Sequence, residues 1–268
     1  LFTLGLFDEK TYVDAQAASD AVKTPESLAY AKQVHEESLV LLKNREQTLP
    51  LNQQTLRART VYIQGFGKAA ELGQQATSAL RETAKQRYGI VSVATPEEAE
   101  VLIYSLRPQS GNYFSATPGL LELDLVDDVE RFDLAGEPYR ETTLAGVDQL
   151  IQQLEAAQAR GAQTIVILNF TLPWIVKRIE PHADALIASF DAFDEAQLKL
   201  IMGEVSPKGA LPLTLPASAE VIEVQDGVSI SPNDVPGYDK EQYMPEGLQY
   251  AYKDADGHDY RLGFGLDY

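Results

Sequence analysis

Carboxylate side chains are concentrated in one irregular stretch of the chain, residues 107–140. Within it, Glu122 and Asp124 flank Leu123, so an extended backbone would direct both carboxyls to the same side. A carboxyl group can donate or accept a proton in a reaction, and a long loop inside a compact domain is usually functional or disordered. A loop acid is more often simply solvated, but two carboxyls on the same side of a segment could act on one ligand.

Two other polar side chains, Arg107 and Asn169, each follow directly after an apolar run that is typical of a buried strand. In parallel sheets the ligand-binding loops gather where the strands end. The two residues are therefore candidates for binding a ligand.

Other catalytic classes find little support in the residue pattern. The histidines His35, His182 and His258 stand singly, with no pair at metal-ligand spacing, and the chain has no cysteine. A G-x-S-x-G nucleophile motif is also absent. We therefore predict no metal site and no cofactor.

A glycine-rich loop, Gly65–Ala70, follows the apolar run Thr60–Ile63 and loosely matches a dinucleotide-binding fingerprint. The next predicted strand, Ile90–Val93, ends in Ala94-Thr95-Pro96, with no acidic residue to bind a ribose hydroxyl. A tight strand-to-helix turn is the simpler interpretation of these glycines.

The elements that must position these residues alternate between strand and helix. Buried strands are predicted at Thr60–Ile63, Val101–Leu106, Thr164–Leu168 and Ala185–Phe190, and helices at Thr142–Arg160 and Glu195–Met202. This alternation is typical of a parallel sheet with crossover helices. We predict an α/β fold, a three-layer α/β/α sandwich around a mainly parallel sheet of about six strands.

Four finer predictions concern local structure. Thr24-Pro25 predicts a helix start, and the apolar stripe after it indicates a helix to about Lys43. A second helix is predicted at Trp174–Ile179, after Pro173. Leu211–Pro216 is predicted to be a short strand after the turn Pro207–Gly209, in which Gly209 should adopt a backbone conformation that favours glycine.

The run Gly203–Pro216 matches the pattern G-x-x-x-P-x-G-x-L-P-x-x-x-P, with two glycines and three prolines at fixed offsets. This resembles a signature of the second domain of family 3 glycoside hydrolases. Near the end of the chain, Glu246–Asp256 resembles the family's E-G-x-x-x-G-Y-R-x-x-D, and Gly263–Tyr268 resembles its P-F-G-x-G-L-S-Y. The departures from these patterns are Ala251, Lys253 and Asp267.

The first residues of the chain resemble the linker that follows the catalytic barrel in the same family, which reads L-G-L-F-(D/E)-N-P-Y-V-D. The resemblance implies that residues 1–23 are an interdomain linker from an N-terminal barrel and that residues 24–268 are the C-terminal α/β sandwich domain.

The resemblance implies hydrolysis of O-glycosidic bonds with retention, as in β-glucosidases and β-xylosidases, which requires two carboxyls about 5–5.5 Å apart. In the family the nucleophilic Asp lies in the barrel, and many members supply the acid–base Glu from a loop of the second domain that reads S-G-E-G. Here that loop reads Ser110-Gly111-Asn112-Tyr113, and an amide cannot protonate a leaving group. The resemblance therefore makes the next acids of this loop the acid–base candidates, Glu122 first and Asp124 second, and we expect Arg107, Asn112 and Asn169 to contact substrate.

The formal net charge of −18 argues against nucleic acid and anionic membranes as partners, and no apolar run approaches the ~18–20 residues of a membrane span. The expected partners are a glycoside or oligosaccharide and the upstream barrel, while the cellular compartment stays open. Because of Asn112, a non-catalytic scaffold or carbohydrate-binding domain is an alternative. A free-standing nucleotide-binding domain, based on Gly65–Ala70, is a weaker one.

Overall fold

The computed structural model of the chain describes residues 2–5, 7, 14–56, 58–110, 122–133, 135–223, 234 and 239–268. Its centre is a five-stranded sheet with the strand order β1-β7-β6-β3-β2. The strands are β1 (Val40–Asn44), β2 (Val61–Gly67), β3 (Val101–Arg107), β6 (Gln163–Asn169) and β7 (Ala185–Ser189). β1 runs antiparallel to β7, and the other neighbouring pairs are parallel. The predicted mainly parallel sheet is confirmed, with five strands where we expected about six.

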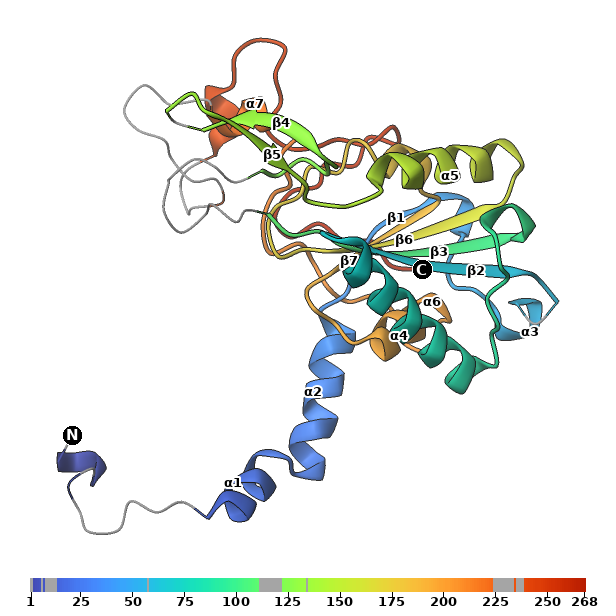
Figure 1. Cartoon of the computed structure of the whole chain (residues 1–268), viewed down its shortest axis with the longest axis vertical. Helices are drawn as coiled ribbons and strands as arrows, with labels where there is room; N and C mark the ends of the chain where they lie inside the picture. The colour runs from blue at the N-terminus through green and yellow to red at the C-terminus, as the bar shows by residue number, and fades with distance from the viewer. Residues whose placement is uncertain are drawn as a thin grey trace.

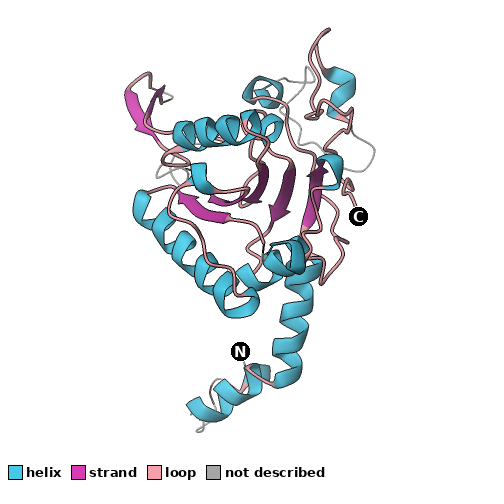
Figure 2. Ribbon diagram, turned by 90° about the vertical axis from the view of Figure 1, so that its right-hand side faces the viewer, coloured by secondary structure: helices cyan, strands magenta, loops and turns pink. Residues whose placement is uncertain are grey.

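Helices cover both faces of the sheet, so the predicted three-layer α/β/α sandwich is also confirmed (Figures 1 and 2). The longer helices are α1 (Ala15–Val22), α2 (Pro25–Glu37), α4 (Ala70–Tyr88), α5 (Val147–Ala159) and α6 (Asp194–Ile201). α5 packs on one face, and α4 and α6 pack on the other. A separate hairpin pairs β4 (Val129–Phe132) with β5 (Pro138–Glu141). The short helices are η1 (Phe2–Leu4), η2 (Arg45–Gln47), α3 (Gln53–Leu56), η3 (Pro96–Glu98), η4 (Glu180–His182), α7 (Ala219–Glu223) and η5 (Lys240–Tyr243).

The parallel strands are buried on both faces. In β3, Leu102 and Tyr104 belong to the core on the α5 side, whereas Val101 and Ile103 belong to the core beneath α4 and α6. Alternate residues of the other strands divide in the same way. Two-sided burial is why these strands appear in the sequence as continuous apolar runs.

The helix predicted from Thr24 to about Lys43 is shorter than expected. It begins as predicted, because the Thr24 side chain accepts a hydrogen bond from the backbone N–H of Ser27 at 3.2 Å. It ends at Glu37, and residues Val40–Asn44 form β1 instead. The apolar residues of β1 are buried on both faces of the sheet, and this burial overrides the helical spacing.

The helix predicted at Trp174–Ile179 does not form. Ile175 donates its backbone N–H to the carbonyl of Leu123 at 3.0 Å. Trp174 is fully buried, and its indole N–H donates to the carbonyl of Asn169 at 3.1 Å. The segment stays irregular because Ile175 pairs with the segment around Leu123 and Asp124 instead of joining a helical run of hydrogen bonds.

Leu211–Pro216, predicted to be a strand of the sheet, pairs instead with the end of the chain. Leu211 donates its N–H to the carbonyl of Phe264 at 2.8 Å, and Leu215 donates to the carbonyl of Tyr260 at 2.9 Å. Prolines at two positions leave this segment without the N–H groups that a central strand requires. Its pairing with the tail keeps it out of the sheet. The predicted strand Ile90–Val93 makes only an isolated bridge, between Ser92 and Val61, whereas the unpredicted β1 joins the sheet.

Gly209 is required for a reason that differs from the predicted one. It does not have a left-handed backbone conformation. A Cβ atom at Gly209 would instead overlap the carbonyl oxygen of Leu39 and lie 2.9 Å from its carbonyl carbon. The turn thus passes directly against the backbone that leads into β1.

Gly209→Val should therefore destabilise the chain by about 1–3 kcal/mol, through overpacking against a backbone that cannot move freely. The midpoint of chemical denaturation measures this loss. Gly209→Ala should show much of the same effect, because the overlap begins at Cβ. Lys208→Val is the matched control, since the neighbouring side chain of Lys208 is 68% exposed. Equal midpoints for Gly209→Val and the wild-type chain would contradict the close approach.

α1 and α2 extend from the sandwich as a separate arm (Figures 1 and 2). No helix in the described part of the chain is both long enough and apolar enough to cross a membrane.

Candidate functional site

Two of the predicted site residues are the last residues of their strands. Arg107 ends β3 in register with Gly67 of β2, and Asn169 ends β6 in register with Ser189 of β7. Because these strands are parallel, both residues lie at the carboxyl edge of the sheet, where such folds bind ligands. Asn112, the third predicted substrate contact, lies outside the described residues.

Arg107 is held by an ion pair at this edge. Its Nη2 lies 2.7 Å from Oδ1 of Asp194, the first residue of α6. Burial raises the pKa of Asp194 above its ordinary value, and the Arg107 guanidinium opposes that shift. The Arg107 side chain remains 44% exposed. A guanidinium has five N–H donors, so Arg107 can also donate hydrogen bonds to a ligand.

Asn169 uses its side chain to hold the turn after β7. Its Nδ2 donates to Oδ1 of Asp191 at 2.8 Å, and its Oδ1 accepts from the backbone N–H of Asp191 at 2.8 Å. Asp191 has a left-handed backbone with φ of 56°, which these two bonds help to stabilise. Asn169 is also almost fully buried, so its contacts suit positioning of the loop more than direct contact with a sugar.

Glu122 and Asp124 lie on an irregular segment beside the loop that follows β6. Asp124 forms a parallel β-bridge with Ile175. The backbone N–H of Asp124 donates to Oε1 of Glu122 at 2.9 Å, so the Glu122 carboxylate lies against the backbone of Asp124. The structure thus brings the two predicted acids together.

Glu122 is already paired with a cation. Its Oε2 accepts a hydrogen bond from Nε of Arg131, in β4, at 2.6 Å, and its side chain is only 9% exposed. Both carboxylate oxygens of Glu122 therefore accept hydrogen bonds from other groups of the chain. Glu122 is engaged in holding this segment, which leaves it less free than an unpaired acid to serve a ligand.

Asp124 differs from Glu122 in its surroundings, which disfavour the charged form of its carboxyl. Burial raises the pKa of Asp124, and the neighbouring Glu122 charge raises it further, against smaller opposing effects of Lys177, Arg131 and Arg178. A carboxyl with a raised pKa beside an ionised carboxylate is the arrangement that general acids use. Of the two predicted acids, Asp124 is the better candidate donor.

The backbone of this segment is fixed by residues that the sequence did not indicate. The hydroxyl of Thr143 donates to the carbonyl of Asp124 at 2.8 Å and accepts from the N–H of Val126 at 2.9 Å. Arg178 donates to the carbonyl of Leu125 at 2.7 Å. These residues are far from Asp124 in the chain, so only the fold brings them together.

A cavity of about 700 Å³ lies close to this segment. Lys177 connects the two, because it lines the cavity and its charge acts on Asp124. Ser218, Glu246, Gln249 and Tyr252 also line the cavity. Hydroxyl, amide and charged groups beside an aromatic ring suit a ligand rich in hydroxyl groups.

The glycine-rich loop after β2 serves close packing. A Cβ atom on Gly65 would lie 2.6 Å from Cβ of Ala76, and one on Gly67 would lie 2.8 Å from Cβ of Leu72. Both neighbours belong to α4, so the glycines let this helix approach the strand. The contacts favour the tight-turn interpretation over dinucleotide binding.

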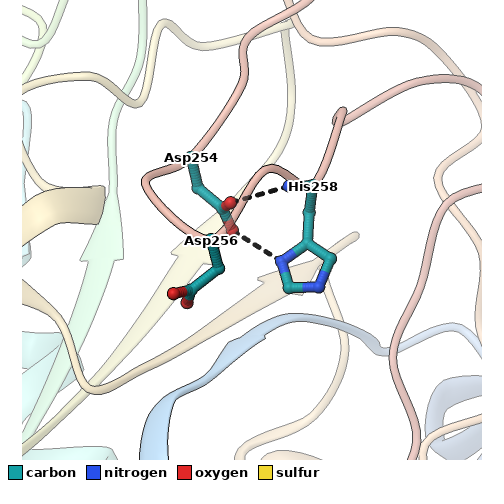
Figure 3. Close-up of side chains that lie close together, drawn as sticks. All are labelled: Asp254, Asp256 and His258. Carbon is teal, nitrogen blue, oxygen red and sulfur yellow. Dashed lines mark hydrogen bonds and ion pairs between the residues drawn. The ribbon is translucent and has the colours of Figure 1, made fainter.

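A further group of titratable side chains lies in the tail, where Asp254, Asp256 and His258 place ligand atoms within 4.8 Å of one another (Figure 3). Sequence spacing did not indicate this group, because it is formed by a tight turn. The buried Asp254 carboxylate accepts from the backbone N–H of His258 at 2.8 Å and contacts its Nδ1 at 2.9 Å. These contacts fix the turn, and they account for the cluster without a metal ion.

Comparison with known proteins agrees with this architecture. The family model described as glycosyl hydrolase family 3 C-terminal domain matches residues 39–268. A protein of Formosa agariphila provisionally named a beta-xylosidase is 28% identical over the whole chain, which covers 34% of that protein. The periplasmic beta-glucosidase of Salmonella typhimurium is 26% identical, again over the whole chain, which covers 39% of it. The chain thus spans about a third of the length of these relatives.

Solved structures show the same fold. A β-glucosidase from Erythrobacter marinus matches 99% of the chain with a TM-score of 0.61 and 18% identity, and the chain covers 38% of it. The β-glucosidase of Listeria innocua in complex with gluconolactone matches 99% of the chain with a TM-score of 0.59 and 19% identity, and the chain covers 37% of it.

Proposed function

Because this chain belongs to the glycosyl hydrolase family 3 C-terminal domain family, we propose that it is the second domain of a retaining β-glycosidase acting on β-glucosides or β-xylosides. The observation that carries the proposal is the family match over residues 39–268. The chain acts together with a preceding catalytic barrel, with residues 1–23 as the linker and residues 24–268 as the sandwich domain.

The retaining mechanism requires two carboxyl groups, and each domain supplies one of them. A carboxylate of the barrel attacks the anomeric carbon while Asp124 donates its proton to the departing oxygen. The ionised Asp124 then removes a proton from water as the water displaces the barrel carboxylate, which releases the sugar and restores Asp124. The raised pKa of Asp124 supports this role.

The other residues at this edge assist the reaction. Burial and the neighbouring Glu122 raise the pKa of Asp124, which favours its protonated form, and the exposed donors of Arg107 bind sugar hydroxyls. Asn169 contributes by positioning Asp191. The cavity lined by Lys177 and Glu246 receives the leaving part of the substrate, a role supported by its size and its polar lining.

A second candidate function is a non-catalytic scaffold or carbohydrate-binding domain. Two observations favour it: Glu122 is already engaged by Arg131, and the amide of Asn169 is already engaged by Asp191. In this case the proton donor lies in another part of the protein.

The 268-residue chain by itself should not hydrolyse a nitrophenyl glucoside or xyloside, because the two-step mechanism requires the nucleophile of the barrel. Release of nitrophenol measures this. The protein that carries the chain together with its preceding domain should release nitrophenol under the same conditions. Turnover by the purified chain, abolished by Asp124→Asn, would show that the mechanism is complete without a barrel.

A further inference from the structure

The arm formed by α1 and α2, residues 14–37, exposes apolar side chains that nothing covers in the described structure. No residue of either helix is buried. The large apolar side chains exposed on the arm are Val22 at 70%, Leu28 at 53%, Tyr30 at 68% and Val34 at 45%. Apolar groups that gather on one exposed element mark a surface that another body covers.

The physical chemistry of helices supports this view. Helices as short as the 8 and 13 residues of α1 and α2 are marginal in water, and proteins stabilise such helices mainly by packing an apolar face. Asp14 and Thr24 cap the two helices, but caps satisfy only the terminal N–H groups. Away from the attached face of α2, the described arm therefore has few tertiary contacts to hold its helices firmly.

One face of α2 is attached to the sandwich through α6. Glu36 lies 2.5 Å from the ammonium of Lys199, and the ring of His35 packs against Phe193 with centroids 3.8 Å apart. At 3.6 residues per turn, Tyr30 and Val34 share a face that points away from these anchoring residues. The anchored face thus fixes the direction in which the apolar face points.

The relatives indicate what covers that face. Two of them align with the whole chain, arm included, although the chain makes up only 34% and 39% of their length. The matched family is described as a C-terminal domain and begins at residue 39, so the arm lies between it and the preceding part of such proteins.

The position of the arm also favours the preceding domain over a second copy of the chain. His35 contacts Phe193, whose neighbour Asp194 pairs with Arg107 at the carboxyl edge. Phe193 is itself 52% exposed, so the anchored end of the arm lies beside an exposed apolar side chain next to the candidate site. The arm is thus attached close to that site, which brings a domain seated on the arm into its neighbourhood.

We infer that the arm is the docking element onto which the preceding catalytic domain packs, with Tyr30 and Val34 inserted into its apolar surface. The inference rests on the proposed function, which supplies the identity of that domain. Beyond that function, the inference identifies the residues through which the sandwich and the preceding domain are joined.

Hydrogen exchange measured by mass spectrometry tests the inference, on the 268-residue chain and on the protein with its preceding domain. Amides of the arm should exchange rapidly in the chain alone and at least about tenfold more slowly in the longer protein. The double variant Tyr30→Ser/Val34→Ser should leave the melting temperature of the chain unchanged. In the longer protein the same variant should return the arm to rapid exchange.

Val91→Ser/Leu72→Ser is the matched control, because these apolar side chains are 71% and 39% exposed away from the arm. It should leave exchange of the arm unchanged in both proteins. Rapid exchange of the arm in the longer protein would overturn the inference. Slow exchange in the chain alone, with a dimer in sedimentation velocity, would assign the face to a second copy and also overturn it.

An activity assay separates this inference from the proposed function. Hydrolysis of a nitrophenyl glycoside by the longer protein without protection of the arm would leave the function standing and reject the docking. Protection of the arm without hydrolysis would leave the docking standing and reject the function.

Discussion

Replacing Asp124 by Asn in the protein that includes the preceding domain should slow hydrolysis of an alkyl glycoside by about 10²–10⁴-fold. An alkoxide is a poor leaving group and needs the proton that an amide cannot supply. A dinitrophenyl glycoside leaves without that help, so its glycosylation step should change much less. Comparison of kcat/KM for the two substrates measures the difference.

Azide provides a second measurement of the same role. Without Asp124 as a base, water attacks the glycosyl-enzyme intermediate only slowly, so the intermediate formed from the activated substrate accumulates. Azide needs no base, so it should partly restore kcat and yield a glycosyl azide.

The control is Asp128→Asn, a change in the same segment at a side chain that is 72% exposed and pairs with Arg140 at the surface. It should leave both substrates unaffected. If Asp124→Asn slows both substrates equally and azide does nothing, Asp124 is not the donor. Glu122→Gln is then tested in the same way, and the same negative result assigns the donor to a residue outside this chain.

The pH dependence follows from the raised pKa of Asp124. A general acid must be protonated, so kcat/KM for the alkyl glycoside should fall as the pH rises through that pKa. Glu122→Gln removes a negative charge that raises the pKa of Asp124, so the alkaline limb of the profile should move to lower pH. A shift to higher pH would contradict the assignment.

Lys43→Met should destabilise the 268-residue chain by about 3–5 kcal/mol, because it leaves a buried carboxylate unpaired. Lys43 Nζ lies 2.6 Å from Oε1 of Glu180, and the two side chains are 8% and 2% exposed. Tyr252 donates its hydroxyl to the other carboxylate oxygen at 2.5 Å. The group joins β1, η4 and the tail, so all three should loosen. The free energy of unfolding from urea titration measures the loss.

The matched control is Lys253→Met, which removes a lysine whose ion pair with Asp259 is exposed. Exposed pairs contribute about 0–1 kcal/mol, so this change should be small. The double variant Lys43→Met/Glu180→Gln should regain part of the loss, since it removes the unpaired charge as well. Equal effects of the two lysine substitutions would show that the Lys43 pair is not buried in solution.

The architecture of the sheet could be predicted from the sequence because its cause is local. Strands buried on both faces must be apolar at every position, and Thr164–Leu168 and Ala185–Phe190 show this directly. The spacing of glycine and proline in Gly203–Pro216 indicated the family although the cause of one of these glycines is not local. Gly209 must be small because the backbone of Leu39 lies against it.

Local patterns failed where partners distant in the chain decided the structure. Residues Val40–Asn44 have helical spacing with the preceding helix, yet pairing with β7 makes them a strand. Trp174–Ile179 follows a proline that could begin a helix, yet its backbone bonds to Leu123. In both places long-range hydrogen bonds and burial outweigh a local preference of a few tenths of a kcal/mol per residue.

The sequence by itself determined a mainly parallel α/β sandwich and placed Arg107 and Asn169 at its carboxyl edge, because both follow from the order of strands along the chain. The residue pattern and the family resemblance also indicated Glu122 and Asp124 as candidates for the proton donor, with Glu122 as the first choice. Only the tertiary structure gave the two acids different chemistry, since Arg131 pairs with Glu122 while burial raises the pKa of Asp124. The protonation of a carboxyl depends on the charges and solvent around it, and these come from segments that meet only in the folded chain.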